Sequence, residues 1–360
     1  MTSSPKITQV ASKPIPFTGF QALWVPGTTR VCTFGSSDAG FGVIQVHTLS
    51  TSSSTSKSPV PGSTTSPHPK LVLHSETEKK SQFKCGTFRA GGSHPPRLVT
   101  GDFDGRVGLW DLNRTEVPLS LLEAHTDIVT CIDGAGAGSL ESLQLPRQEY
   151  VTGCRDGVVK LWDTRQKDQA VSVMAPKKGY GHEVWSVSMN TQSSSSDDLL
   201  VAAGYDNGDI RVLDLAAGKL LFETNVKHGV CSVEFDRRRG TSKRLIATTM
   251  EGTLHSFDLG GSISESNAMV EETITVQTGD ESTLWQARHV PQWQDIFAVT
   301  DGGGNIHMYE QGDAGSLIKS RGVHQFAKEA ILSLEFNDDL EGLFVTCDLS
   351  NTLRVGILNL

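Results

Sequence analysis

A histidine, a threonine and an aspartate lie at a spacing that suggests acid–base chemistry. His125, Thr152 and Asp156 are the side-chain types of a hydrolase triad, in which a carboxylate orients a histidine and the histidine activates a hydroxyl. Trp162 follows six residues after Asp156, and its single N–H donor has no role in a triad. The alternative is structural, because buried polar groups need hydrogen-bond partners and adjacent strands supply them.

Incomplete copies of the same set favour the structural role. One copy, with Thr100, Asp104 and Trp110, lacks the histidine. Another copy, with His182 and Asp206, has leucine at position 213 in place of the tryptophan. A nucleophile elbow of the form GxSxG occurs nowhere in the sequence. We therefore interpret these residues as structural hydrogen-bond networks, and we expect that the protein is not an enzyme.

Metal and nucleotide sites are not indicated either. No two cysteines form a CxxC pair; they stand mostly within apolar runs, at positions 32, 85, 131, 154, 231 and 347, where cysteine behaves as a small hydrophobe. The stretch "DGAGAGS" (133–139) lacks the Lys-Ser/Thr of a phosphate-binding loop and precedes an expected hairpin rather than a helix. We expect no metal, no cofactor and no disulfide.

Composition and charge limit the partners. The 360 residues are 37% hydrophobic and carry a formal net charge of −9. The densest basic cluster, 237–244, is short and lies between two apolar strands, so we expect no nucleic-acid partner. No run of 18 apolar residues occurs and the N-terminus lacks an apolar signal core, which predicts a cytoplasmic protein without a membrane segment.

An internal repeat sets the architecture. "GDFDGRVGLWD" (101–111) and "GCRDGVVKLWD" (153–163) are near twins, and weaker copies of the marker strand follow at spacings of 44 to 64 residues. An Asp-Gly or Asn-Gly turn precedes each of the clearer marker strands, and two apolar strands lie before that turn. A further strand follows the marker strand, so each unit contains four strands. Four strands in each of seven units predict an all-β, seven-bladed propeller that spans residues 1–360 as one domain. It resembles the WD-repeat family.

The two ends of the sequence suggest how the ring closes. The last unit stops at its third strand, "LRVGILNL", and the only spare strand is "KITQV" (6–10). We expect the N-terminal strand to complete the last blade, because pairing removes an exposed sheet edge. Ser/Thr/Pro-rich residues from about 50 to 70 and the polar stretch 191–198 are expected to be mobile surface loops.

One position of each innermost strand is a candidate for protein binding. When these strands are aligned on their apolar pattern, the residue after the first apolar position is Phe20, Lys84, Thr130, Trp185, Cys231, Trp285 and Leu332. In WD repeats this position tends to approach the channel and the top face. Aromatic side chains there form either a protein hot spot or a wedge of core between blades, since aromatics dominate both.

Longer stretches are more specific than the repeat. "AGYDNGDIRVLDL", "FETNVKHGVCSVEFDR", "TGCRDGVVKLWDTRQKD" and "STLWQARHVPQ" are similar to Monad-type WD-repeat proteins, the axonemal dynein assembly factors. The Ser/Thr-rich segment departs from that family. The resemblance implies a cytoplasmic adaptor between axonemal dynein heavy chains and chaperone machinery, namely the Hsp90 co-chaperone complex with its AAA+ ATPases and prefoldin-like module. We expect the chain to be monomeric by itself.

Two alternatives remain open at this stage. The first is a WD-repeat scaffold of another complex, such as a ubiquitin-ligase substrate receptor or a signalling adaptor. The second is a propeller enzyme, which would need acidic or metal-ligating side chains around the channel. The seven aligned positions contain neither a carboxylate nor a histidine, which favours a binding protein.

Overall fold

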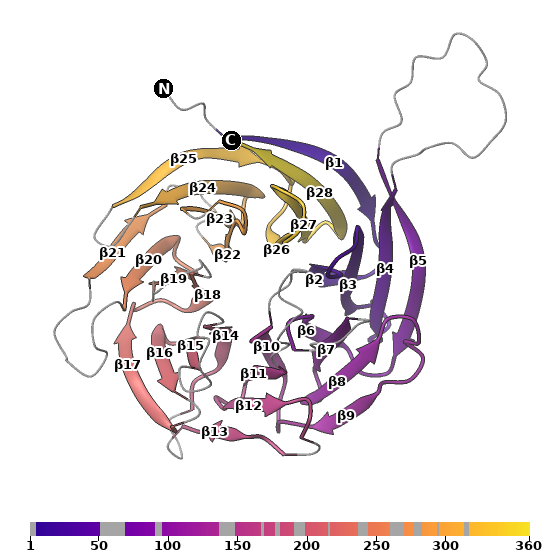
Figure 1. The fold of residues 1–360 in the computed structure, drawn as a ribbon, viewed down its shortest axis with the longest axis horizontal. Coiled ribbons are helices and arrows are strands. Elements are labelled where there is room, and N and C mark those ends of the chain that lie inside the picture. Colours follow the sequence, from indigo (N-terminus) through magenta and orange to yellow (C-terminus); the bar gives the residue numbers. More distant parts are fainter. Residues whose placement is uncertain are drawn as a thin grey trace, which may run out of the picture.

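The chain forms a ring of seven antiparallel sheets in a computed structural model (Figure 1). The structure describes residues 5–50, 69–90, 96–136, 148–166, 169–176, 181–190, 199–214, 217–236, 244–259, 270–276, 283–293, 295–312 and 317–360. The predicted all-β seven-bladed propeller is confirmed, since each sheet has four strands. Within the described ranges, no helix is long and apolar enough to cross a bilayer.

Blades 1 to 6 each use four consecutive strands. Blades 1 to 3 are β2 (Thr18–Trp24), β3 (Arg30–Ser36), β4 (Gly42–Ser50), β5 (Lys70–Lys79); β6 (Phe83–Thr87), β7 (Arg97–Asp102), β8 (Arg106–Asp111), β9 (Ser120–Glu123); and β10 (Val129–Gly134), β11 (Glu149–Cys154), β12 (Val159–Asp163), β13 (Ser172–Met174). Blades 4 to 6 are β14 (Val184–Met189), β15 (Leu200–Tyr205), β16 (Asp209–Asp214), β17 (Lys219–Asn225); β18 (Val230–Phe235), β19 (Arg244–Thr249), β20 (Thr253–Asp258), β21 (Val270–Thr275); and β22 (Leu284–His289), β23 (Ile296–Asp301), β24 (Asn305–Gln311), β25 (Ile318–Gln325). The Ser/Thr/Pro-rich segment joins β4 to β5; its residues 51–68, like 191–198, lie outside the described residues.

Blade 7 combines both ends of the chain. Its strands are β26 (Ile331–Phe336), β27 (Leu343–Asp348), β28 (Thr352–Asn359) and β1 (Lys6–Pro14). β1 runs antiparallel to β28 from Lys6 opposite Asn359 to Pro14 opposite Thr352. The predicted closure is confirmed, and the closing strand extends four residues beyond the expected "KITQV" (6–10).

Tight hairpins join the second and third strands of the blades. Gly105 and Gly157 occupy the turns of the twin sequences with φ angles of 81° and 83°, a region that L side chains rarely adopt. At Gly105 a Cβ atom would also lie 2.4 Å from the carbonyl oxygen of His125. The repeated glycine is therefore required by both the turn and the close approach of the loop that leads into the next blade.

Every innermost strand has an irregularity at the same place. The register of each pair of first and second strands shifts at one residue near the start of the first strand, which indicates a β-bulge. The seven bulge residues are Phe20, Lys84, Thr130, Trp185, Cys231, Trp285 and Leu332. All seven are partly exposed, whereas the residue before each one is buried.

Side chains of one blade complete the inner edge of the next. Backbone N–H groups of an innermost strand donate to the innermost strand of the preceding blade at six of the seven junctions. These bonds are Gly86 N to Gln21 Oε1 (2.9 Å), Met189 N to Asp133 Oδ2 (2.8 Å), Phe235 N to Ser188 Oγ (3.1 Å), Ala287 N to Ser232 Oγ (3.3 Å), Leu334 N to Gln286 Oε1 (2.6 Å) and Ala22 N to Ser333 Oγ (3.1 Å). At the junction of blades 2 and 3, the Cys85 thiol donates to the Val129 carbonyl (3.3 Å).

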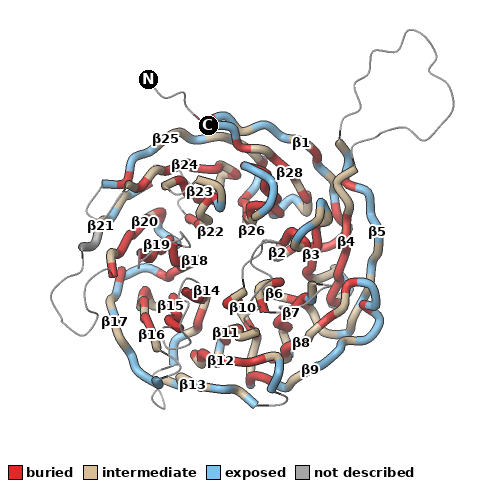
Figure 2. Tube along the Cα trace, viewed as in Figure 1, coloured by how far each residue is buried: buried red, intermediate tan, exposed pale blue. Residues whose placement is uncertain are grey.

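Apolar side chains between adjacent sheets form the core. Figure 2 shows burial concentrated in the inner strands, while the outermost strands β5, β9, β13, β17 and β25 carry much of the exposed surface. The largest fully buried side chains include Phe34, Phe257 and Phe344, from blades 1, 5 and 7. Each sheet thus buries both faces of its inner strands against its neighbours.

Deletion of residues 1–12 should destabilise the whole ring. It removes most of β1, including Ala11, which is buried in the core next to blade 1, and it exposes the edge of β28. We expect the midpoint of thermal unfolding to fall by several degrees or more, measured by circular dichroism. Deletion of residues 1–4 alone, which precede β1, is the control; equal stability of the two truncations would contradict closure through β1.

Candidate protein-interaction site at the channel mouth

The seven bulge residues line one cavity. The cavity has a volume of about 570 Å³ and is also lined by Phe103 and Met250, which lie between the second and third strands of blades 2 and 5. We call this site, the seven bulge residues with Phe103 and Met250, the channel mouth. Every one of the binding candidates predicted from the sequence therefore lies at one place, on seven different sheets.

Aromatic side chains dominate the channel mouth. Phe20 packs against Phe103 with ring centroids 5.8 Å apart. The Trp185 indole lies against the backbone of Gly229, where an added Cβ would be 2.6 Å from the ring, and its N–H donates to Glu183 Oε2 (3.1 Å). This surface is concave, partly exposed and apolar, which is typical of a site that receives apolar side chains of a partner.

A belt of charged residues follows the bulge residues along the chain. We call Arg89, Asp133, Glu234, Arg288, Glu335 and Asp338 the charged belt; four of them stand three positions after a bulge residue, while Arg89 and Asp338 lie just beyond the ends of β6 and β26. Arg288 is central: its guanidinium pairs with Glu234 (3.0 Å) and Glu335 (3.3 Å), and it also lines the cavity of the mouth. Arg288 therefore connects the charged belt to the apolar mouth.

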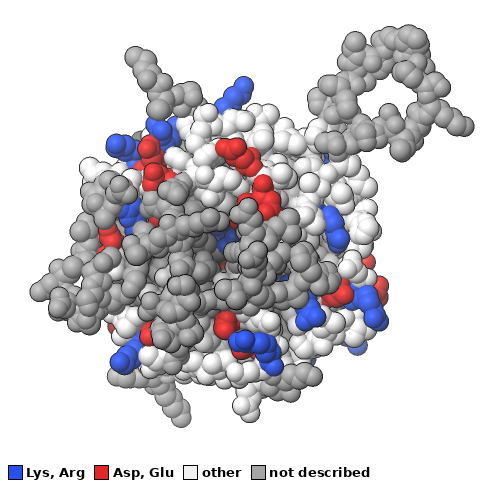
Figure 3. Space-filling view, viewed as in Figure 1, with Lys and Arg blue, Asp and Glu red and all other residues white. Residues whose placement is uncertain are grey.

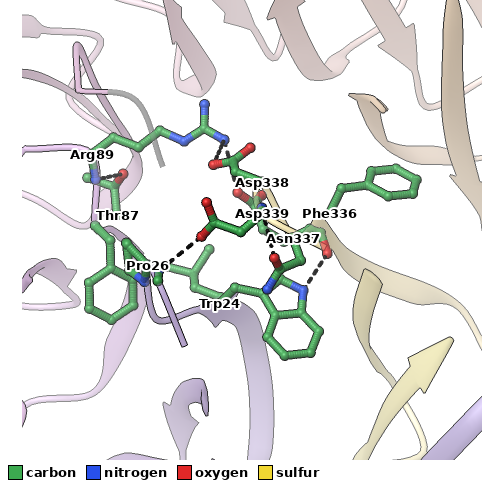
Figure 4. A pocket seen from close by; sticks show the side chains of 12 residues that line it. Trp24, Pro26, Thr87, Arg89, Phe336, Asn337, Asp338 and Asp339 are labelled. Atoms are coloured by element: carbon green, nitrogen blue, oxygen red, sulfur yellow. Dashed lines mark hydrogen bonds and ion pairs between the residues drawn. The ribbon is translucent and has the colours of Figure 1, made fainter. Parts of the chain in front are cut away.

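The belt continues into a small pocket between blades 7, 1 and 2. Figure 4 shows Arg89 extending toward Asp338, with ion-pair distances of 3.2 Å to Glu335 and 3.9 Å to Asp338. Trp24 donates its indole N–H to the Glu335 carbonyl (3.2 Å), and Gly27 N donates to Asp339 Oδ2 (3.2 Å). With a cavity of only about 30 Å³, this pocket holds the blades together rather than a ligand.

Burial alters the acidity of two carboxyls in the belt. Burial raises the pKa of Asp133 to about 6, against the opposing charge of Arg89 and the hydrogen bond from Met189 N. Burial likewise raises the pKa of Asp338 to about 6, again opposed by Arg89. The Arg288 charge and the His289 hydrogen bond together outweigh burial at Glu234 and lower its pKa.

His125, Thr152 and Trp162 form a buried chain of hydrogen bonds in blade 3. The Trp162 indole N–H donates to Thr152 Oγ1 (2.8 Å), and the Thr152 hydroxyl shares a second hydrogen bond with His125 Nε2 (2.7 Å). His125 Nδ1 then faces Asp156 Oδ2 at 3.8 Å. Asp156 also accepts from Val158 N (2.9 Å) and Thr126 Oγ1 (3.0 Å).

The aspartate of this chain is held in its charged form. Burial works to raise the pKa of Asp156, but the facing His125 ring, the Cys154 side chain and the hydrogen bonds from Val158 N and Thr126 outweigh it and hold the pKa well below its usual range. Its contribution to stability is therefore present above the usual carboxyl pKa and is lost as the pH falls below that value.

His125 and Asp156, together with the neighbouring Cys154, have the side-chain types of a metal site. His125, Cys154 and Asp156 place one ligand atom each within 4.8 Å of one another. A thiolate is needed to bind metal, but burial raises the pKa of Cys154 to about 12, and its thiol donates to the Asp127 carbonyl (3.2 Å). His125 Nε2 and Asp156 are engaged in the hydrogen bonds of blade 3, so the donor set does not fit a metal.

The comparisons with known proteins agree with this architecture. A family model described as WD domain, G-beta repeat matches residues 116–163. The proteins named Dynein axonemal assembly factor 10 of Xenopus tropicalis and Homo sapiens are each 34% identical over 98% of this chain, and cover 96% and 97% of their own length. That of Chlamydomonas reinhardtii is 32% identical over 99% of this chain and 98% of its own.

The chain belongs to the dynein axonemal assembly factor 10 family. The resemblance to the WD-repeat axonemal dynein assembly factors is thereby confirmed over nearly the full length. The similarity to the dynein axonemal assembly factor 10 proteins spans all seven blades, so it includes the mouth and the belt as well as the repeat.

Two of the expected networks differ from blade 3. In blade 2 Trp110 donates to Thr100 (2.8 Å), but the Asp104 carboxylate lies outside this pair and forms an exposed ion pair with Arg106 (3.2 Å). The buried acid is Asp102, which accepts from Asp104 N and Arg106 N. The expected placement of Asp104 in a buried network is therefore wrong, because no histidine stands opposite it.

His182 and Asp206 meet, but only at the surface. Their ring nitrogen and carboxylate lie 3.3 Å apart, with side chains 46% and 32% exposed. In the register of blade 4, Ala203 and Leu213 replace the Thr152 and Trp162 of blade 3, so no buried chain can extend from the pair. It is an exposed ion pair of small energetic value.

Sequence reasoning missed a second kind of connection within blades 4, 6 and 7. The residue that ends the second strand contacts the residue six positions later on the third strand. Asp301 pairs with His307 (2.8 Å) and Asp348 with Arg354 (2.7 Å), while the Arg211 guanidinium lies 4.6 Å from the Tyr205 ring centroid. In blades 6 and 7 the available signal was an acid followed six residues later by a basic residue across a hairpin, and in blade 4 a tyrosine stands in the place of the acid.

Asp156→Ala should destabilise the protein. It removes the carboxylate that faces His125 Nδ1 and the acceptor of Val158 N, so we expect a loss of about 1–3 kcal/mol in the free energy of unfolding, measured by urea denaturation. Asp104→Ala, at the matching position of blade 2, is exposed and should cost no more than about 0.5 kcal/mol. Equal losses would show that blade 3 has no buried network.

Asp133→Asn should weaken the pH dependence of stability between pH 5 and 7. Because the folded pKa is raised to about 6, the folded state binds a proton before the unfolded state does, and this carboxyl adds stability as the pH falls from 7 to 5. Asparagine keeps an acceptor for Met189 N but does not titrate. Urea titrations at both pH values should show a smaller gain for the variant than for the wild type; Asp104→Asn is the control, and an unchanged gain would contradict the assignment.

Proposed function

We propose that this protein is a non-catalytic scaffold for the preassembly of axonemal dyneins, and that it binds a protein partner through the channel mouth. The observation that carries the proposal is the convergence of Phe20, Phe103, Trp185, Trp285 and Leu332 on one partly exposed cavity. Buried aromatic anchors within a rigid concave surface are characteristic of protein hot spots. A bulge in each of seven strands, rather than a flexible loop, holds this surface in place.

The names of the family members indicate the cellular process. Its members are named for axonemal dynein assembly, and we extend that role to this chain as a cytoplasmic activity. As partners we propose axonemal dynein heavy chains and the chaperone machinery that the resemblance implies, namely the Hsp90 co-chaperone complex with its AAA+ ATPases and prefoldin-like module. A monomeric ring with a mouth at one end and an outer rim of exposed strands has room for more than one partner.

Charge supports proteins rather than nucleic acid as partners. The chain has a formal net charge of −9, and on the face seen in Figure 3 the visible basic and acidic side chains are interspersed. Binding to a phosphate backbone requires clustered Lys and Arg. The second candidate, a WD-repeat receptor or adaptor of another complex such as a ubiquitin ligase, would use the same mouth and is distinguished by the proteins that co-purify.

Trp185→Ala and Trp285→Ala test the mouth. Both side chains are partly exposed, so we expect each variant to lose about 30-fold or more in affinity for the partner, which corresponds to the ~2 kcal/mol of a hot-spot residue. The measurement is co-purification of tagged protein with axonemal dynein heavy chains from ciliated cells, with the melting temperature determined in parallel. Leu121→Ala, on the exposed strand β9 (51% exposed), is the control.

Two results would contradict the proposal. A large fall in melting temperature with normal co-purification would make the tryptophans core residues between blades. Full dynein arms in cells that lack the protein would remove it from dynein assembly, and co-purification with ligase subunits instead of dynein would favour the second candidate.

A further inference from the structure

Lys84 is an uncompensated cation in the channel mouth. Its Nζ lies 4.5 Å from the centroid of the Phe20 ring, and it lines the cavity. Among the described residues, no carboxylate lies within ion-pair distance of Lys84, and its Nζ makes no hydrogen bond. Burial lowers the pKa of this ammonium, because it removes water from around the charge.

The other charged residues around the cavity are already paired. Arg288 contacts Glu234 and Glu335. Glu183 accepts from the Trp185 indole (3.1 Å) and lies 3.9 Å from Arg155 Nε. Lys84 therefore differs from these charged neighbours, because among the described residues its ammonium contacts the face of the Phe20 ring and no carboxylate.

Two further hydrogen-bonding groups of the lining residues are without a partner. Trp285 Nε1 and Ser186 Oγ are buried and make no hydrogen bond among the described residues, although Trp185 donates to Glu183. Among the acceptors of the lining, Gln21, Ser232 and Gln286 accept backbone N–H groups across blade junctions. The hydrogen-bonding groups of the mouth that lack a partner are therefore mainly donors. A buried donor without a partner costs free energy.

We propose that the channel mouth binds an acidic, apolar linear segment of a protein partner, with a side-chain carboxylate on Lys84 and an apolar side chain between Trp185 and Trp285. The inference rests on the proposed function, since it names the chemistry of the segment that the same mouth receives. Lys84 belongs to β6 and Trp285 to β22, which lie on opposite sides of the central opening (Figure 1). One segment that crosses the mouth can therefore contact both.

The size of the site suits this occupant. A cavity of about 570 Å³ lies within the range of roughly 300–1,000 Å³ that ligand pockets occupy. The net charge of −9 repels acidic chains over long distances, so the attraction of an acidic segment depends on short-range contact with Lys84. Such an ion pair, formed away from water, is stronger than one at an exposed surface.

The test is selection from a phage library of random 12-residue peptides on the full-length protein. Wild type should enrich peptides with Asp or Glu near Leu, Phe or Trp. Lys84→Met keeps the aliphatic stem and removes the charge, so it should enrich the apolar residues without the acidic ones. Lys219→Met, at an exposed position of β17, is the matched control and should select as wild type does.

Affinities of one enriched peptide then separate the contacts. We expect Lys84→Met to weaken binding roughly 10- to 100-fold, as expected for the loss of a charge-assisted hydrogen bond. Replacing the acidic residue of the peptide by its amide should weaken binding to wild type equally and leave binding to Lys84→Met unchanged. Peptides with amidated C-termini should bind as well as those with free C-termini.

Several outcomes would overturn this inference. They are a wild-type selection without acidic residues or without any enriched family, a Lys84→Met variant that retains the acidic preference, and binding that requires a free C-terminus. In each of these cases the proposed function stands if Trp185→Ala and Trp285→Ala still lose the partner. If the tryptophan variants bind it normally, the proposed function itself fails.

Discussion

The structure depends on how the inner edge of each sheet is satisfied. An innermost strand has backbone groups that no strand of its own sheet can pair, and a buried unpaired N–H is costly. Here the preceding blade supplies the acceptor from a side chain, such as Ser333 for Ala22 N and Gln21 for Gly86 N. Because each blade takes its acceptor from the one before it, the inner edge of blade 1 is satisfied only when blade 7 joins it and the ring closes, and β1 on β28 completes that last blade.

The same geometry separates apolar and charged functions along one axis. A bulge at the start of each innermost strand directs seven residues into the mouth, and three positions later four of these strands contribute Asp133, Glu234, Arg288 and Glu335 of the charged belt. Arg288 belongs to the belt and lines the mouth as well. A surface held by strands and ion pairs requires little movement before a partner binds, which reduces the entropic cost of association.

The repeat made the fold predictable, because each hairpin uses local turn chemistry and a period of about 50 residues. The alignment of innermost strands also identified the mouth residues, since the bulge follows one apolar position in every blade. The belt was not predictable, because Arg89, Glu234 and Glu335 come from different blades and meet only in the closed ring. Asp104 and His182 were misplaced because the sequence shows the residue types of a network but not their burial.

The pairing of Lys6 with Asn359 has a consequence for the order of folding. Blades 1 to 6 are each local in sequence and can form their hairpins as the chain leaves the ribosome, one after another. Blade 7 requires two strands separated by nearly the whole chain, and contacts of such long sequence separation form slowly because loop closure costs entropy. During synthesis the nascent protein is therefore an open arc with two exposed edges, and that arc is the form most prone to aggregation.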